Sequence, residues 1–301
     1  MRTALLISAF IVLSIGIAFT IRTDVAGVSR LPSMANPAKV EEKVTGSGVL
    51  SLDVLHKWEV PQVLKEISAL TYIGPQRFAC VQDELGKIFI YNTQKDAIEK
   101  EIPFAPPGDY EGLAIAGKDA YVLRADGRIF EVRDYDGTKP KIFEHPTSLT
   151  KKHDTEGLCY DSKGDRLLIA IKEKEPASDD YKGIYSFSLI NKSFAPEPVY
   201  KIDLNNKVFE DVKTKKPGAE MQPSAIAVHP QTGDIYIAEA TKPKLLIIDR
   251  KGSIKSLENL KDKDFNQPEG ISFDPQGNLF VANEGDKKEP GNILQLVGLN
   301  K

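Results

Sequence analysis

The sequence QPEGISFDPQGNLFVANE, from Gln267 to Glu284, has the pattern of a β-hairpin. The segments GISF and LFVA are rich in strand-forming residues, and the intervening DPQGN carries the Pro, Gly and Asn residues that form tight turns. Glu269 stands where the first strand is expected to begin, between Pro268 and Gly270. Charged residues are seldom buried without a partner, so the position of this carboxylate needs an explanation. Copies of the same pattern elsewhere in the chain supply one.

The hairpin recurs along the chain. The stretches YEGLAIAGKDAYVLRADGRIFEV, TEGLCYDSKGDRLLIAIKE and PSAIAVHPQTGDIYIAEATKPKLLIID share its plan of a short strand, a turn containing Gly or Asp, and a second apolar strand. The stretch ISALTYIGPQRFACVQDELGKIFIYN is a more altered copy. A third apolar strand usually follows. Short strands at regular spacing, with turns between them, predict an all-β repeat fold.

One residue position aligns in all five copies, directly before a Gly or an Ala. It is occupied by Ser68, Glu111, Glu156, Ser224 and Glu269, which are 43, 45, 68 and 45 residues apart. These periods are typical of four-stranded propeller blades, and an insertion over residues 205–220 accounts for the long one. We therefore predict a β-propeller over residues 48–301, with five blades and six as the alternative. The segment LSLDVLHKWEV is expected to close the ring of blades against the C-terminal copy.

The five aligned residues, here called the axial ring, are expected to meet at the centre of the propeller. The first strand of each blade lines the central channel, and three carboxylates brought together there repel one another unless a cation lies among them. Oxygen ligands without His or Cys suit a hard cation, and flexible sets of about six to eight ligands favour Ca²⁺ over Mg²⁺. We predict that the axial ring binds Ca²⁺. The alternative is a solvated channel whose charge Lys172 or Arg124 neutralises.

Two further sets of polar residues surround the predicted ring. The residues two positions earlier are expected to hold waters or to orient the ligands: Glu66, Asp109, Asp154, Gln222 and Gln267. The loops after the second strand of each hairpin gather on one face of a propeller, and they predict a charged funnel formed by Asp83, Glu84, Arg124, Lys172, Glu173, Glu239 and Glu284. We expect a small polar ligand or a protein loop to bind in this funnel. A solvated rim is the alternative.

The runs LKEISALTY, VQDELGKIFIYN, DYEGLAI and DTEGLCYD resemble the SdiA-regulated family of bacterial extracytoplasmic propellers, which is similar to NHL-repeat proteins. The resemblance covers most of Trp58 to Leu296 and implies a membrane-associated or periplasmic propeller. The ring order Ser, Glu, Glu, Ser, Glu is also similar to the axial Ca²⁺ ring of calcium-activated nucleotidases of the apyrase type. That second resemblance supports the ring residues as ligands but does not extend to nucleotide hydrolysis, because no phosphate-binding cluster accompanies the ring.

The N-terminal segment differs from the rest of the chain. Residues 4–21 carry no charge, and this length predicts a membrane anchor or a cleaved signal peptide over residues 1–22. Residues 23–47 are polar and irregular, and are expected to form a flexible linker. We therefore expect the propeller to lie on the extracytoplasmic, periplasmic side of the cell membrane, held by residues 4–21. If the signal is cleaved, the protein is expected in the periplasm.

The composition narrows the function further. The 301 residues carry a formal net charge of −3 and no long basic run, so no nucleic-acid partner is expected. Cys80 and Cys159 lie in apolar strand patterns and are expected to be buried. The expected function is a Ca²⁺-binding propeller that binds a ligand or a protein. The alternative is a Ca²⁺-dependent hydrolase of the lactonase or phosphoesterase type, with Glu111, Glu156 or His153 as base and an open metal position.

Overall fold

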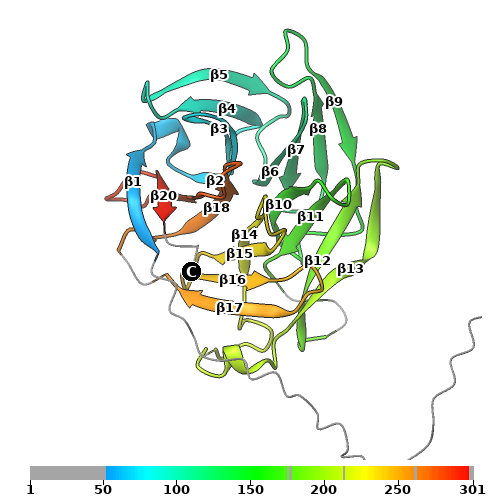
Figure 1. Ribbon diagram of the computed structural model, residues 1–301. Helices are drawn as coiled ribbons and strands as arrows, with labels where there is room; N and C mark the ends of the chain where they lie inside the picture. The colour runs from blue at the N-terminus through cyan, green and yellow to red at the C-terminus, as the bar shows by residue number, and fades with distance from the viewer. Residues whose placement is uncertain (1–51, 174, 176–177, 213, 261–262, 298–301) are drawn as a thin grey trace, which may run out of the picture. The chain divides into compact units, whose positions relative to one another are not determined.

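The computed structural model describes residues 52–173, 175, 178–212, 214–260 and 263–297, which form a five-bladed β-propeller (Figure 1). Each blade is a four-stranded antiparallel sheet, and the first strands of successive blades contact one another in a ring. The predictions of an all-β fold and of five blades are confirmed. The predicted N-terminal segments 1–22 and 23–47 lie outside the described residues. None of the helices that the structure describes is long and apolar enough to cross a bilayer.

In four of the blades the strands follow chain order from the axis outward. Blade 1 contains β2 (Ile67–Gly74), β3 (Arg77–Gln82), β4 (Lys87–Asn92) and β5 (Ala97–Pro103). Blade 2 contains β6 (Tyr110–Ala116), β7 (Asp119–Arg124), β8 (Ile129–Arg133) and β9 (Lys141–His145). Blade 3 contains β10 (Thr155–Asp161), β11 (Arg166–Ile171), β12 (Tyr181–Ser188) and β13 (Ser193–Asp203). Blade 4 contains β14 (Pro223–Val228), β15 (Ile235–Glu239), β16 (Lys244–Ile248) and β17 (Ile254–Asn259).

Blade 5 combines the two ends of the propeller sequence. It contains β18 (Pro268–Phe273), β19 (Leu279–Asn283) and β20 (Asn292–Val297), and its outer strand is β1 (Asp53–Glu59). Strand β1 pairs antiparallel with β20, with Trp58 opposite Ile293, so the strand that precedes blade 1 completes the last blade. This confirms the closure predicted from LSLDVLHKWEV. In the described part of the chain, two short 3-10 helices lie in connections, η1 (Gln62–Leu64) before blade 1 and η2 (Lys207–Phe209) before blade 4.

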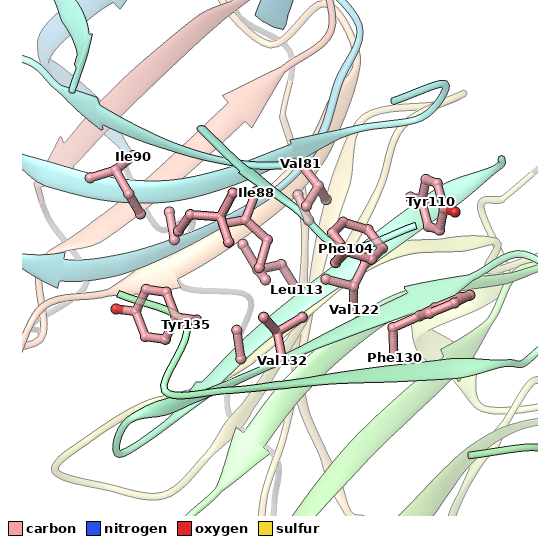
Figure 2. Packing of buried hydrophobic residues seen from close by; sticks show 14 residues of the cluster. Val81, Ile88, Ile90, Phe104, Tyr110, Leu113, Val122, Phe130, Val132 and Tyr135 are labelled. Atoms are coloured by element: carbon pink, nitrogen blue, oxygen red, sulfur yellow. The ribbon is translucent and has the colours of Figure 1, made fainter. Parts of the chain in front are cut away.

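The apolar core is divided among the boundaries between neighbouring blades, with one cluster at each. Figure 2 shows the cluster between blades 1 and 2, where Val81 and Ile88 face Leu113 and Val122. Each of these side chains is at most 2% exposed, and burying an aliphatic side chain of this size contributes about 1.5–3 kcal/mol. The same packing buries both free cysteine thiols, as predicted. Blade-to-blade packing therefore holds the inner strands close to the axis.

A β-bulge occurs at the same point in all five inner strands. In each strand the pairing register with the second strand shifts by one residue, and the extra, unpaired residue is a member of the axial ring: Ser68, Glu111, Glu156, Ser224 or Glu269. A bulge bends its strand and turns the extra side chain out of the regular alternation. The repeated bulge is therefore the local structure that sets the direction of the ring residues.

The glycine that follows each ring glutamate permits close approach between neighbouring inner strands. A Cβ atom added to Gly112 would lie 2.6 Å from the Cβ atom of Leu158, and one added to Gly270 would lie 2.9 Å from the backbone nitrogen of Leu70. Contacts this short force the neighbour to move. The Glu-Gly pairs of the sequence thus place a carboxylate on the axis and remove the side chain that would obstruct the next strand.

Replacing Gly112 with Ala is expected to lower the free energy of unfolding by about 1–3 kcal/mol, because the new methyl group overpacks the contact with Leu158. Urea unfolding followed by Trp58 fluorescence measures the change. The reverse exchange in blade 1, Ala69→Gly, is the matched control and is expected to cost no more than about 1 kcal/mol. An unchanged Gly112→Ala midpoint at constant slope would contradict the close-approach account.

Candidate cation site on the propeller axis

Three carboxylates of the axial ring lie together at the centre of the propeller. Glu111, Glu156 and Glu269 come from the bulges of β6, β10 and β18, and all three line one small axial cavity. Glu156 is 4% exposed and Glu269 is 8% exposed, whereas Glu111 is partly exposed. The cavity has a volume of about 10 Å³, which is close to the room needed by one water molecule. The predicted convergence of the ring glutamates is therefore present, with two of the carboxylates buried and the third partly exposed.

The two serines of the ring connect neighbouring inner strands. The Ser68 hydroxyl donates a hydrogen bond of 2.6 Å to the carbonyl oxygen of Tyr110 in blade 2. The Ser224 hydroxyl donates an equivalent bond of 2.6 Å to the carbonyl oxygen of Pro268 in blade 5. Both serines are buried. Since each hydroxyl proton is used between blades, only the oxygen lone pairs of these residues are left to face the axis as acceptors or ligands.

One lysine approaches the ring carboxylates. Lys172, in the loop after β11, places its Nζ atom 2.8 Å from Glu156 Oε1. Burial lowers the pKa of Lys172, but the charge and hydrogen bond of Glu156, together with the charges of Glu269 and Asp154, outweigh it. The net shift is therefore upward, and the ammonium stays charged. Arg124 does not take this role, because its guanidinium forms two hydrogen bonds with Asp126, at 2.9 and 2.8 Å. Among the residues that the structure describes, the three carboxylates thus share one ammonium group, and fully ionised they leave a net charge of −2.

The excess negative charge appears in the pKa values of the ring. Burial, followed by the charge of Glu156 and a hydrogen bond with Asp109, raises the pKa of Glu111 to about 10. Burial and the charge of Glu156 raise the pKa of Glu269 to about 8. Burial raises the pKa of Glu156 to about 7, and Lys172 limits that rise. The Oε2 atom of Glu269 is also buried without a hydrogen-bond partner. The ring is therefore short of positive charge and of hydrogen-bond donors.

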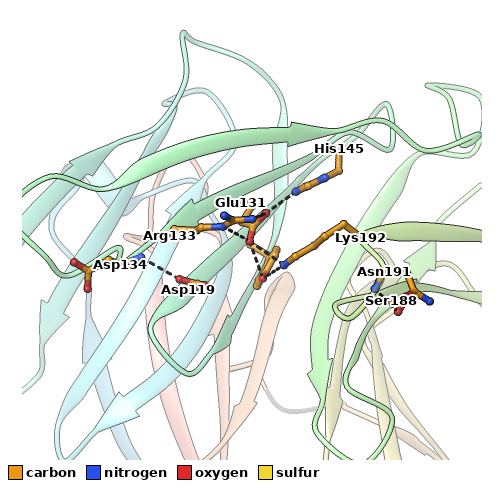
Figure 3. Close-up of polar contacts among 9 residues, drawn as sticks. Asp119, Glu131, Arg133, Asp134, His145, Ser188, Asn191 and Lys192 are labelled. Atoms are coloured by element: carbon orange, nitrogen blue, oxygen red, sulfur yellow. Dashed lines mark hydrogen bonds and ion pairs between the residues drawn. The ribbon is translucent and has the colours of Figure 1, made fainter.

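A buried carboxylate at the boundary of blades 2 and 3 shows the opposite situation (Figure 3). Glu131 is fully buried and binds Arg133 at 2.9 Å, His145 at 2.7 Å and Lys192 at 2.8 Å. Burial alone would raise its pKa, but the hydrogen bonds from these three partners lower it to about 2. This chain therefore compensates a buried carboxylate fully at one site and leaves three carboxylates undercompensated on the axis.

The residues predicted to support the ring lie just before the inner strands, and they differ in what they contact. Asp109 shares a hydrogen bond with Glu111, and Gln267 Nε2 donates to Glu269 Oε1 at 3.2 Å. The charge of Asp154 acts on Glu156, in the same blade. The other two residues face the funnel: Gln222 Nε2 donates to Glu173 at 3.4 Å, and the charge of Glu66 acts on Asp83 and Glu284.

The predicted funnel residues divide into two groups. The first group lies near the axis and consists of Asp83, Lys172, Glu173 and Glu284. Burial, and then the charge of neighbouring carboxylates, raises the pKa values of Asp83 and Glu284. Glu173 forms an ion pair with Lys216.

The other funnel residues are placed elsewhere. Glu239 forms a buried ion pair with Lys244 at 2.6 Å across the β15–β16 hairpin, and Arg124 pairs with Asp126. Glu84 lines a separate cavity of about 460 Å³ beside Pro107. The part of the funnel above the ring is therefore strongly acidic, with Lys172 at its base.

A buried lysine that was not among the predicted site residues holds the loop of Lys172 in place. Lys182, on β12, is 1% exposed, and its ammonium donates to the carbonyl oxygens of Lys172 at 2.9 Å and Glu173 at 2.5 Å. Burial lowers the pKa of Lys182 to about 8. The signal for this role is present in the sequence as a charged residue inside the apolar strand YKGIYSFS.

The axial carboxylates do not form a finished metal site in this conformation. Among the described residues, no group of three or more His, Cys, Asp or Glu side chains is arranged to hold a metal ion. His153, considered above as a base, is turned to its own loop, where its Nδ1 atom accepts a hydrogen bond of 2.9 Å from the backbone nitrogen of Thr150. The chemistry that the ring offers is a set of buried oxygen donors with uncompensated negative charge.

Without a bound cation, the protein is expected to lose stability as the pH rises from about 5 to about 9. The folded pKa values of Glu156 and Glu269 are raised to about 7 and about 8, so the folded state binds these protons more tightly than the unfolded state does. Stability is then greatest below the unfolded pKa. It falls by up to about 1.4 kcal/mol per pH unit and group between the unfolded and the folded pKa, and the fall ends once the folded carboxyl has titrated.

Thermal unfolding in EGTA over this pH range measures the loss. The Glu269→Gln variant, which removes one titrating group, is expected to show a flatter profile, whereas the exposed-site control Glu197→Gln is expected to follow the wild type. A wild-type profile that rises with pH would contradict the account.

Comparisons with known proteins agree with this architecture. Similar solved structures include the glutaminyl cyclase of Myxococcus xanthus, with 12% identity, coverage of 82% of this chain and 95% of that chain, and a TM-score of 0.54. A streptogramin B lyase structure is also similar, at 12% identity, 83% and 100% coverage and a TM-score of 0.46. At 12% identity, the likeness to the glutaminyl cyclase shows the fold alone. A search of curated proteins finds no match. A family model described as SdiA-regulated matches residues 53–287, and the chain belongs to the SdiA-regulated family.

Proposed function

We propose that this protein is an extracytoplasmic, membrane-tethered propeller that binds Ca²⁺ on its axis and presents the acidic funnel to a small polar ligand or a protein. The observation that carries the proposal is the set of three axial carboxylates, which line one small cavity and share one described lysine. Burying like charges together is costly unless a cation compensates them. The net charge of −2 that the ionised groups leave is the charge that a divalent cation neutralises.

The donor set fits Ca²⁺ in its chemistry. Carboxylates of Glu111, Glu156 and Glu269 would hold the ion, and the oxygens of Ser68 and Ser224 are further candidates. Hard oxygen donors suit Ca²⁺, and its flexible coordination tolerates side chains that come from separate strands. The Oε2 atom of Glu269 has no hydrogen-bond partner and is therefore available as a ligand for a cation. Binding requires the three side chains to draw closer than they lie here, which the long Glu side chain permits.

A cation at this position would act first on stability. It would remove the repulsion among blades 2, 3 and 5, whose inner strands supply the carboxylates, and would bind the folded chain only. Lys172 would then remain beside Glu156 as a second positive charge.

The binding role follows from the scaffold. Loops held by rigid strands commonly carry functional residues, and here the loops with Asp83, Glu173 and Glu284 surround the acidic entrance to the axis. Tethering through residues 4–21 follows from the uncharged N-terminal segment. The Ca²⁺-dependent hydrolase stays an alternative prediction, since it uses the same ion and also needs a free coordination position.

Ca²⁺ is expected to raise the thermal midpoint of the purified protein relative to EGTA. A ligand that binds only the folded state at about 100 times its Kd stabilises by about 2.7 kcal/mol. The Glu156→Gln and Glu269→Gln variants are each expected to lose most of this rise, and Glu197→Gln, on the exposed outer strand of blade 3, is expected to keep it. Differential scanning calorimetry measures all four proteins. Equal midpoints in Ca²⁺ and EGTA for the wild type would refute the axial Ca²⁺ site.

A further inference from the structure

A third cavity lies in blade 2, away from the axial ring. It has a volume of about 590 Å³ and is bounded by the loop after β7 on one side and by residues 146–152, which connect β9 to β10, on the other. That volume falls within the range of about 300–1,000 Å³ that is usual for small-molecule sites. The cavity shares no lining residue with the axial cavity. It is therefore a separate candidate for ligand binding.

Hydrogen bonds within the described loops hold the walls of this cavity in place. The Thr147 hydroxyl donates to the carbonyl oxygen of Gly127 at 2.8 Å and accepts from the backbone nitrogen of Leu149 at 3.1 Å. Leu149 is 6% exposed and belongs to the apolar cluster between blades 2 and 3. The two loops are thus bonded to each other and anchored in the core, so the cavity is formed before any ligand arrives.

The charged groups around the cavity are mostly positive. The cavity is lined by Arg128, Lys151 and Lys152. Among the described residues, no carboxylate forms an ion pair with either lysine, whereas Arg128 pairs with Glu144. The one lining carboxylate, Asp126, is engaged by two hydrogen bonds from Arg124. This concentration of positive charge stands out in a chain whose formal net charge is −3.

Arg128 is incompletely satisfied where it lies. Its Nη1 atom binds Glu144 at 2.7 Å, but its Nε atom is buried without a hydrogen-bond acceptor. Arg and Lys are the residues that hold phosphate groups, Arg through its fork and Lys as a point charge. Pro146 and Leu149 add apolar surface beside these cations.

We propose that this cavity binds a small phosphate monoester, whose dianionic phosphate is held by Lys151, Lys152 and Arg128 and whose organic part contacts Pro146 and Leu149. A dianion matches the two lysines, which lack a carboxylate partner among the described residues. The organic part accounts for a cavity much larger than a phosphate group. The proposal does not depend on a cation in the axial ring.

Titration of the full-length protein with phenyl phosphate, followed by isothermal titration calorimetry and ³¹P NMR, tests the proposal. Saturable binding at one site per chain is expected, and benzyl alcohol, which has a similar ring without the phosphate, is expected not to bind. The double variant Lys151→Gln/Lys152→Gln is expected to weaken phenyl phosphate binding at least tenfold. The matched control Lys139→Gln/Lys141→Gln removes the same charge at the other end of β9 and is expected to bind like the wild type.

Three results would overturn the proposal. The first is a wild-type protein with no saturable binding. The second is an equal loss of binding in both double variants, which would reduce the effect to net charge. The third is binding of citrate as tight as that of phenyl phosphate, which would remove the preference for phosphate. Thermal midpoints within about 2 °C of the wild type verify that the variants are folded, and Arg128→Gln provides an independent second variant of the cavity.

Discussion

The cost of ionising three neighbouring carboxylates on the axis, through burial and then mutual repulsion, is the constraint around which the centre of this propeller is organised. The bulge in each inner strand places one residue out of the regular alternation, and in blades 2, 3 and 5 that residue is a glutamate followed by a glycine. The glycine permits the neighbouring strands to approach, and this approach brings the carboxylates together. Close packing at the axis and concentration of negative charge are therefore two results of the same local structure.

The rest of the fold supplies the stability that such a centre requires. Apolar clusters fill all five blade boundaries, and the pairing of β1 with β20 joins the first and last segments of the propeller. Ser68 and Ser224 connect inner strands where no glutamate is present, and Lys172, held by Lys182, neutralises one glutamate. The contrast with Glu131, which has three cationic partners, indicates that incomplete compensation on the axis is a local property of this site, and such sites are functional candidates.

Much of this architecture is predictable from the sequence, because a propeller repeats one unit and the spacing of the ring residues marks each blade. The closing strand around Trp58 is predictable for the same reason, since a ring needs a partner for its last blade. The bulges are not predictable from the sequence, because they depend on the pairing register between strands. The ion-pair partners of individual side chains were not predicted either. Glu239 and Arg124 were expected to face the funnel. Glu239 instead pairs with Lys244, directly opposite in its hairpin, and Arg124 pairs with Asp126.

The most direct test of the central claim is the anomalous scattering of crystals grown with Ca²⁺, collected at a long wavelength. The account predicts one strong peak on the axis, with oxygens of Glu111, Glu156 and Glu269 at about 2.3–2.6 Å from it. No axial peak, with Lys172 still bound to Glu156 and only water among the carboxylates, would contradict it.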